Sequence, residues 1–168
     1  AKTVTGSRHL FESSDQRILV DCGLFQGVKD LRLRNWEPFA VDPASIDAVL
    51  LTHGHLDHVG YLPCLVRDGF KGSIYCTKPT AAVASVILKD GAKIQKEEAE
   101  TANQKGYSRH KPARPLYLLK DVQKVLERIK IVSPDQWVDL STQNRCRWRP
   151  VGHILGACFL ELDLNGVR

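Results

Sequence analysis

The sequence predicts an α/β domain in which two β-sheets pack together and helices lie outside them. Short apolar runs typical of strands occur near the start of the chain and again near its end. The segment between them has mainly helical spacing. The length of 168 residues, with 43% hydrophobic and 26% charged residues, fits one globular domain.

The first part of the chain predicts three strands and one short helix. Residues 3 to 12 alternate weakly, and residues 16 to 21 are a stronger apolar run that ends at Asp21. Residues 24 to 36 carry basic side chains among leucines and predict a short helix with a basic face. Residues 48 to 51 are continuously apolar, as a buried strand is. A carboxylate at the end of a buried strand, such as Asp21, is a candidate for a functional site or caps the next loop.

The middle of the chain predicts two helices with a strand between them. Residues 59 to 68 have helical spacing, and residues 73 to 77 predict a strand. A long helix is predicted from Pro79, with a polar, solvated part over residues 93 to 105, and Gly91 is expected to weaken or bend it. Its apolar face is expected to consist of four β-branched side chains, Val83, Val86, Ile87 and Ile94.

The last part predicts one more helix followed by strands. Residues 121 to 130 have apolar side chains at helical spacing. Residues 131 to 132 and 145 to 151 predict strands, and residues 158 to 164 alternate as a half-exposed strand does. The pair Asn-Gly at 165–166 is a strong hairpin signal with only two residues after it. Because the chain also starts without methionine, we expect a fragment of a longer protein.

A basic loop is predicted between the two helices of the middle and last parts. Residues 105 to 114 combine basic side chains with Tyr107. This composition suits contacts with phosphate groups, and a solvated loop explains it equally well.

The overall composition gives weaker indications about partners and location. The formal net charge of +5 and the pI near 9.0 favour polyanionic partners mildly. The sequence has no apolar run as long as a membrane span and no signal peptide, so we expect no membrane association and a cytoplasmic location. Five scattered cysteines without a C-x-x-C motif predict small buried side chains in a reducing compartment.

The clearest functional signal directly follows the apolar run of the third predicted strand. Within six residues the sequence places four side chains of the types that bind divalent metals, His53, His55, Asp57 and His58. Such a density of polar groups would be unsatisfied in a hydrophobic core. His53 and His55 are expected to face one ion, and Asp57 and His58 a second ion beside it. Gly54 is expected to let the backbone bend tightly.

The segment from Thr52 to His58 resembles the signature motif of the metallo-β-lactamase superfamily. The stretch around His153, Gly152 to Ala157, is similar to the third motif of that superfamily. The resemblance implies an α/β fold of the αββα sandwich type. Four further stretches resemble the β-CASP branch of RNA-processing nucleases, especially bacterial proteins similar to the catalytic subunit of the cleavage-and-polyadenylation complex: residues 3–7, 19–27, 51–63 and 97–110.

The resemblance implies a role for each candidate side chain. His53, His55 and His153 would bind a first zinc ion and leave one position for water. Asp57 and His58 would bind a second zinc ion. Asp57 would also be the catalytic residue, because it would orient the attacking water or accept its proton.

The resemblance also implies a supporting residue and an incomplete site. Asp21 would orient the ligand loop from behind the metal. Family members carry a later aspartate that bridges the two metals, an inserted β-CASP domain and a last zinc histidine, and none of these occurs in this sequence. Residues 1 to 168 are therefore expected to be the N-terminal portion of a metallo-β-lactamase-like domain, with a full ligand set for one zinc ion.

The implied function is zinc-dependent cleavage of RNA phosphodiester bonds, with RNA as the partner and a homodimer as a further expectation. A first alternative keeps the fold and changes the substrate to a small ester, thioester or lactam. A second alternative is a truncated, non-catalytic metal-binding module. The residues that bind the substrate are not predicted.

Overall fold

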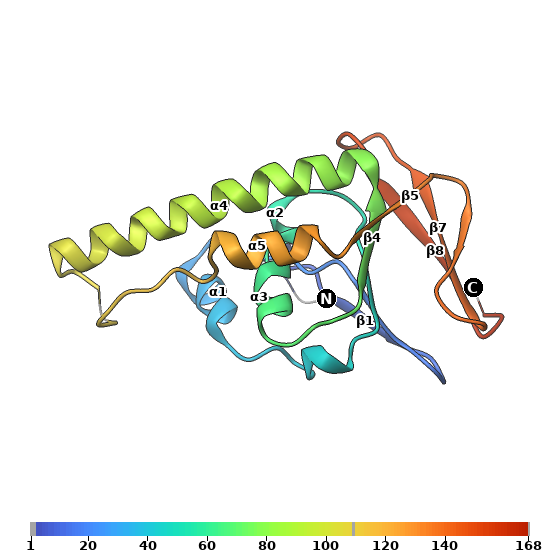
Figure 1. Cartoon of the computed structure of the whole chain (residues 1–168), viewed down its shortest axis with the longest axis horizontal. Helices are drawn as coiled ribbons and strands as arrows, with labels where there is room; N and C mark the ends of the chain where they lie inside the picture. The colour runs from blue at the N-terminus through green and yellow to red at the C-terminus, as the bar shows by residue number, and fades with distance from the viewer. Residues whose placement is uncertain (1–2, 109, 168) are drawn as a thin grey trace.

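The computed structural model describes residues 3–108 and 110–167, which form two β-sheets with helices against the first of them (Figure 1). The first sheet has the order β1-β2-β3-β4-β5 and the second the order β6-β7-β8. The strands are β1 (His9–Glu12), β2 (Arg17–Val20), β3 (Ala48–Leu50), β4 (Ser73–Thr77), β5 (Ile129–Val132), β6 (Trp137–Asp139), β7 (Asn144–Pro150) and β8 (Cys158–Leu164). The helices are α1 (Lys29–Leu33), η1 (Arg34–Trp36), η2 (Pro43–Ser45), α2 (Leu56–Val59), α3 (Leu62–Arg67), α4 (Lys78–Lys105) and α5 (Leu119–Leu126), where η marks a 3-10 helix.

The first sheet is parallel apart from its β1 edge, and both of its faces are covered. β1 pairs antiparallel with β2, whereas β2 to β5 run parallel. One face packs against α3, α4 and α5 through a cluster that includes Leu65, Leu88 and Val122. The other face packs against the second sheet through Leu50 and Trp148. Burial on both faces explains why the central strands are continuously apolar. The layers confirm the predicted α/β class with helices outside the sheets.

Most predicted elements are present, and two strands have the predicted bounds, Ser73–Thr77 and Cys158–Leu164. The helix predicted over residues 59 to 68 is present as α3, but it starts only at Leu62, because the preceding α2 ends at Val59 as a separate short helix. The helix predicted over residues 121 to 130 ends at Leu126 instead, because Ile129 is already paired with Ile74 in the sheet.

The predicted apolar face of α4 is wrong at two of its four positions, whereas Val83 and Ile87 are half-buried. Val86 is 69% exposed and Ile94 is 46% exposed. The buried side of α4 is formed by smaller residues and one leucine, Thr80, Ala84, Leu88, Ala92, Ala99 and Ala102. Small side chains let the helix lie close to the layer below it. Among the described residues, no helix is both long and apolar enough to cross a membrane.

Gly91 has a different role from the one predicted, because α4 continues through it without interruption. A side-chain carbon at Gly91 would lie 2.6 Å from the Tyr117 hydroxyl oxygen. Glycine at this position therefore provides space for the segment that precedes α5.

All five cysteines are free and buried, as predicted. Burial raises the pKa of the Cys64 and Cys76 thiols to about 12. These thiols stay protonated at neutral pH, so they act as small packing residues rather than as nucleophiles or metal ligands.

Two hydrogen bonds join the second sheet to the chain directly after β3. The indole nitrogen of the fully buried Trp148 donates to the Leu51 carbonyl at 2.9 Å. The amide of Cys158, the first residue of β8, donates to the Thr52 carbonyl at 3.0 Å. The second sheet thereby fixes the backbone from which the predicted metal-binding loop begins.

Replacing Trp148 with phenylalanine tests this junction. The variant loses the indole donor and leaves the buried Leu51 carbonyl unpaired, which should lower the free energy of unfolding by about 1–3 kcal/mol. Urea denaturation followed by circular dichroism measures this change. Trp36→Phe is the matched control, because Trp36 is exposed and its replacement should change stability by less than about 0.5 kcal/mol. Equal losses in the two variants would contradict the proposed importance of the junction.

Candidate metal centre

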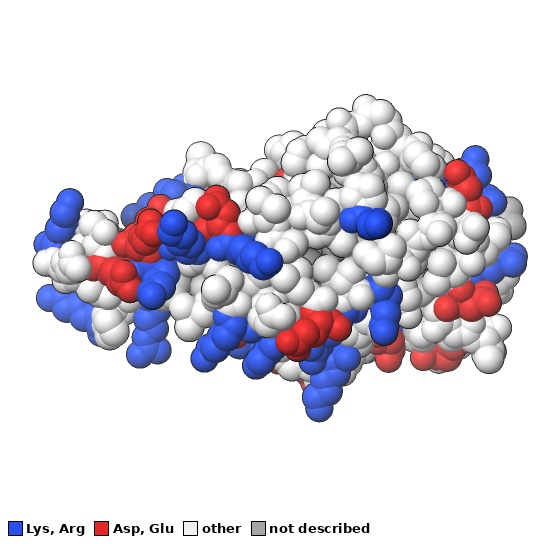
Figure 2. Space-filling model, turned by 45° about the horizontal axis from the view of Figure 1, so that its top comes forward, with Lys and Arg blue, Asp and Glu red and all other residues white. Residues whose placement is uncertain are grey.

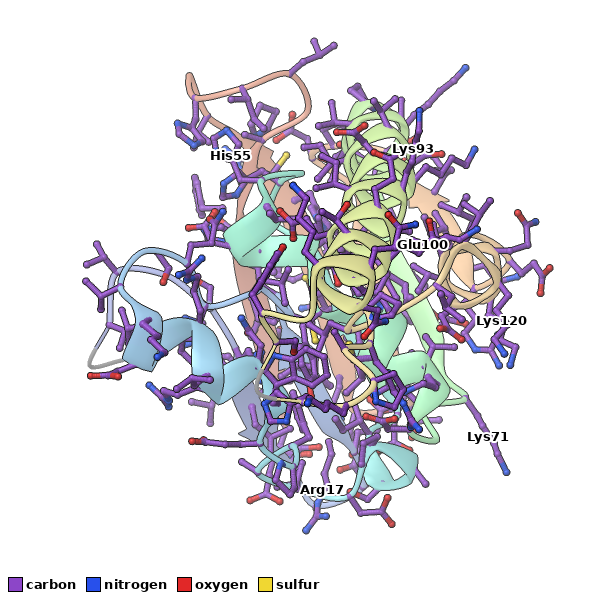
Figure 3. The ribbon with its side chains drawn as sticks, turned by 90° about the vertical axis from the view of Figure 1, so that its left-hand side faces the viewer. Arg17, His55, Lys71, Lys93, Glu100 and Lys120 are labelled. Carbon is purple, nitrogen blue, oxygen red and sulfur yellow. The ribbon has the colours of Figure 1, made fainter. Side chains whose placement is uncertain are left out.

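Three histidines from two distant parts of the chain meet at one point. His53 and His55 follow β3, and His153 lies in the loop between β7 and β8. Their ligand atoms all lie within 4.8 Å of one another. The shortest approaches are 3.1 Å from His53 Nε2 to His55 Nδ1 and 3.2 Å from His153 Nε2 to His55 Nδ1. Figure 3 shows His55 beside the loop that leads into β8.

The first two histidines are placed by the end of β3 and the start of α2. His55 precedes the first turn of α2 with extended backbone, and its carbonyl accepts the amides of His58 and Val59. Gly54 does not supply the predicted tight bend, because its φ is not positive. A side-chain carbon at Gly54 would instead lie 2.7 Å from Val83 Cγ1. Glycine is needed there because α4 approaches the loop closely.

The loop that carries His153 is anchored to the start of α4 through Gly156. The hydroxyl groups of Thr77 and Thr80 both donate to the Gly156 carbonyl at 2.9 Å. Gly156 has a φ of 83°, and a side-chain carbon there would lie 2.7 Å from the amide nitrogen of Thr80. Both the backbone conformation and the close approach therefore require glycine. This anchor was not predicted from the sequence, although Thr-Lys-Pro-Thr at residues 77–80 has the composition of a helix start.

Asp21 lies behind the predicted metal-binding loop and is bonded to Thr52 and His58. It is only 2% exposed. Its Oδ1 accepts the Thr52 amide at 2.9 Å. Its Oδ2 accepts the Thr52 hydroxyl at 2.8 Å and lies 2.7 Å from His58 Nδ1. Asp21 also has a φ of 58°, an unusual backbone conformation for a residue other than glycine. The surrounding hydrogen bonds hold it there.

This network determines which ring nitrogens carry protons when the histidines are neutral. Because the Thr52 hydroxyl donates to Asp21, its oxygen accepts the Nδ1 proton of His53 at 2.9 Å. The Nε2 lone pair of His53 then faces the other two imidazoles. In the same way His58 donates its Nδ1 proton to Asp21, and its Nε2 faces the Asp57 carboxylate at 3.6 Å. Asp21 therefore fixes the rings of His53 and His58 so that the Nε2 lone pair of each points away from Asp21.

A second backbone contact holds the Asp21 loop against α2. The Cys22 amide donates to the His58 carbonyl at 2.7 Å, and the Ser7 amide donates to the Asp57 carbonyl at 2.9 Å. A side-chain carbon at Gly23 would collide with the Asp57 carbonyl. The loop that follows Asp21 is thus in direct contact with the backbone of α2.

Asp57 and His58 form a separate pair beside the three histidines. The ring of His58 lies 3.9 Å from that of His53, centroid to centroid. Among the described residues, the group of three or more ligands that could hold one ion comprises His53, His55 and His153 only. The arrangement is compatible with a second ion beside the first, and that assignment remains a prediction.

The electrostatics of the centre differ between His53 and His58. Burial, followed by the nearby His58 and the other histidines, lowers the pKa of His53 to about 4. Burial acts against protonation of His58 as well, but the Asp21 hydrogen bond and charge outweigh it and raise the pKa of His58. Asp21 therefore controls His58, whereas His53 is neutral at physiological pH.

The chemistry of the three histidines fits a divalent metal. Several nitrogen atoms face one another across the centre, and neutral rings have too few protons to join them all by hydrogen bonds. A cation satisfies all the inward lone pairs together.

The comparisons with known families agree with this geometry. A family model described as "Metallo-beta-lactamase superfamily" matches residues 6–135. The chain belongs to the metallo-β-lactamase superfamily. This superfamily is metal-dependent, which is consistent with the three converging histidines.

The relatives found by sequence belong to the β-CASP RNA-processing branch, as the resemblance implied. Ribonuclease TTHA0252 of Thermus thermophilus is 36% identical over 99% of the chain and 34% of its own length. Transcription termination factor FttA of Methanocaldococcus jannaschii is 27% identical over 98% of the chain and 24% of its own length. Cleavage and polyadenylation specificity factor subunit 3-I of Arabidopsis thaliana is 29% identical over 91% of the chain and 20% of its own length. The chain spans about a fifth to a third of these relatives.

Solved structures confirm the superfamily fold. A B3 metallo-β-lactamase with an active-site glutamic acid matches with a TM-score of 0.55 and 20% identity, over 95% of the chain and 52% of that structure. Zinc-bound PqqB of Methylobacterium extorquens matches with a TM-score of 0.56 and 14% identity, over 96% and 50%. At these identities the likeness concerns the fold alone.

Replacing Asp21 with asparagine tests its role at the centre. The amide lacks the charge that raises the pKa of His58, and its NH2 group replaces one of the two oxygens that accept protons from Thr52 and His58. We expect zinc affinity to fall roughly 10- to 100-fold. We also expect the pKa of His58 in the metal-free protein to fall, because burial then acts without compensation. Competition with a chelator and NMR titration of the histidines measure the two effects. Asp90→Asn, on the exposed side of α4, is the control and should change neither; an unchanged His58 pKa in Asp21→Asn would contradict the assignment.

Proposed function

We propose that this chain contributes the zinc-binding core of a β-CASP-type ribonuclease that hydrolyses phosphodiester bonds in RNA. The observation that carries the proposal is the convergence of His53, His55 and His153 within 4.8 Å. The 36% identity to a ribonuclease over 99% of the chain directs it toward RNA. Small esters, thioesters and lactams are less favoured, because the metallo-β-lactamase structures support only the fold at 20% identity.

In this proposal the three histidines hold one zinc ion, and Asp57 and His58 belong to a second site beside it. When bound, zinc lowers the pKa of water from 15.7 to about 7 and stabilises negative charge on the scissile phosphate. The Asp57 carboxylate is partly exposed and lies 3.6 Å from His58 Nε2. It can therefore accept a proton from a water molecule on the open side of the site. Asp21 keeps His58 and the loop in place.

The positive charge of the chain is the feature of its surface that supports an anionic substrate. The net charge of +5 favours sequence-independent contacts with phosphates, which weaken with salt. Figure 2 shows blue side chains gathered at the end of the view where α4 projects from the body, interspersed with red ones, and a wide uncharged area elsewhere on that face. A homodimer remains a prediction from the sequence.

The zinc content of the purified chain and its variants tests the ligand set. We expect the wild-type protein to bind at least one zinc ion per chain, and His153→Ala to lose most of it because only two of three ligands remain. His9→Ala is the matched control, since His9 is exposed on β1 and should keep wild-type zinc content. Elemental analysis after dialysis measures both. Zinc-free wild-type protein, or a His153→Ala variant that keeps its zinc, would contradict the proposed centre.

Replacing Asp57 with asparagine tests the catalytic assignment. The amide cannot accept a proton, so metal-dependent cleavage of a labelled RNA should fall at least roughly 100-fold. The melting temperature should stay near that of the wild type, because the Ser7 contact uses the backbone carbonyl of Asp57. Asp90→Asn should retain full activity.

Parallel assays with RNA and with a chromogenic lactam separate the competing functions. Turnover of the lactam without cleavage of RNA would support a small-molecule hydrolase. Zinc binding without turnover of either substrate would support a non-catalytic metal-binding module.

A further inference from the structure

A second surface with the chemistry of a binding site lies along the far half of α4. Trp36 at the end of η1 and Tyr107 after α4 line one hollow of about 370 Å³, together with Arg114. Trp36 is 59% exposed and Tyr107 is 65% exposed. Single exposed apolar residues are ordinary, but two large aromatic rings on one hollow beside an arginine are the composition of a recognition surface.

The lining of this hollow, which we call the α4 groove, includes several small apolar side chains. They are Ala99 and Ala102 of α4 and Ala113 of the following loop. Ala99 and Ala102 were unexpected in the buried set of α4, and their small size keeps the groove open. The groove therefore offers the width and the apolar contact that a planar ring needs.

The two sides of the α4 groove are held rigidly by two asparagine side chains. Asn35 donates to the Phe25 carbonyl at 2.8 Å and accepts the Phe25 amide at 2.9 Å, which fixes η1 and with it the backbone of Trp36. Asn103 donates to the Ala113 carbonyl at 3.0 Å and accepts the Ala113 amide at 2.7 Å. The backbone beside Trp36 and the two ends of the loop that carries Tyr107 are therefore held by hydrogen bonds, which lowers the entropy lost on binding.

The charge around the α4 groove favours an anionic partner. Residues 105–114 contain four Lys or Arg and no acidic residue. Arg109, one of the four, lies outside the described residues. Glu98 lines the groove, whereas the neighbouring Glu97 and Glu100 are paired with Lys93 and Lys96 within α4. Aromatic rings, an arginine and a basic loop together match the way in which single-stranded nucleic acid is bound.

We propose that the α4 groove binds single-stranded RNA by stacking bases on Trp36 and Tyr107, while the basic loop contacts phosphates. The inference rests on the proposed function, since it takes RNA as the substrate. It adds a binding surface for the part of the RNA that lies away from the scissile bond.

The α4 groove and the metal centre are arranged so that one strand can reach both. Val83 of α4 contacts the metal-binding loop at Gly54, and the groove extends from Gln95 to Ala102 on the same helix. At 1.5 Å per residue these points are about 18–28 Å apart. Figure 3 shows His55 and α1 on one side of α4 and α5 on the other. At the stacked spacing of about 3.4 Å per nucleotide, the separation corresponds to roughly five to eight nucleotides, and to fewer when the strand is extended.

The test compares binding of four oligomers to metal-free protein in EDTA by fluorescence anisotropy. The probes are labelled oligouridines of 4 and 20 nucleotides and abasic ribose-phosphate oligomers of the same lengths. We expect Trp36→Ala and Tyr107→Ala to weaken binding of the 20-nucleotide RNA by roughly 5- to 150-fold each. Binding of the abasic oligomers should change less than twofold, because they carry phosphates but no bases.

Matched variants separate stacking from apolar burial and from misfolding. Trp36→Phe should keep most of the affinity and Trp36→Leu should lose it, because only phenylalanine has an aromatic face. Phe159→Ala removes a half-exposed ring from β8 and should bind like the wild type. Equal affinities of wild type, Trp36→Ala and Tyr107→Ala for the 20-nucleotide RNA would overturn the proposal, as would equal losses with the abasic oligomer.

A cleavage assay with added zinc distinguishes this proposal from the proposed function. Trp36→Ala should raise the KM for RNA of 20 nucleotides and leave the KM for RNA of 4 nucleotides unchanged. Trp36-dependent RNA binding without cleavage would overturn the proposed function alone. Cleavage without any Trp36 dependence would overturn the α4 groove alone.

Discussion

The metal centre depends on the contact between the two sheets directly behind it. Leu51 and Thr52 leave the first sheet, and their carbonyls are bonded to Trp148 and to the amide of Cys158 in the second. The loop with His153 starts from the same second sheet. His53, His55 and His153 can be brought together only if both loops are fixed with respect to each other, because the two loops are far apart in the chain. The three histidines can therefore form a common site only when the two sheets are packed together.

The sequence allowed the local part of this arrangement to be predicted. The spacing of His53 to His58 after an apolar run identified the loop, because strand, turn and ligands are neighbours in the chain. The strands at Ser73–Thr77 and Cys158–Leu164 were predicted with their bounds, because each is a short apolar or alternating run. The approach of His153 could not be derived from spacing, since a hundred residues separate it from the other two. Only the resemblance of its surroundings to a family motif assigned it.

The errors in the prediction have one physical cause, which is packing between segments distant in sequence. Hydrophobicity suggested that the valines and isoleucines of α4 face the core, yet the alanines do, because the helix lies close to its neighbours. Gly54 and Gly91 were assigned backbone roles, but both glycines provide space for a facing side chain. A single sequence does not show which side chain will face a glycine. The same holds for Gly156, whose threonine partners are more than seventy residues away.

In the proposed function, the charges of the candidate centre contribute little to the affinity for a long RNA strand. The neutral His53 carries no charge that could attract a polyanion over a distance, and Asp21 and Asp57 would repel one before metal is bound. A bound zinc ion offsets these carboxylates locally, and its effect on a long strand is limited by screening over about 8–10 Å. Binding of the rest of a strand must therefore depend on groups elsewhere on the surface. In the described residues, the basic loop after α4 and the aromatic rings of the α4 groove combine charge with a face on which bases can stack. In the proposed function, α4 connects the two surfaces, because one part of it contacts the loop at Gly54 and its far half lines the α4 groove.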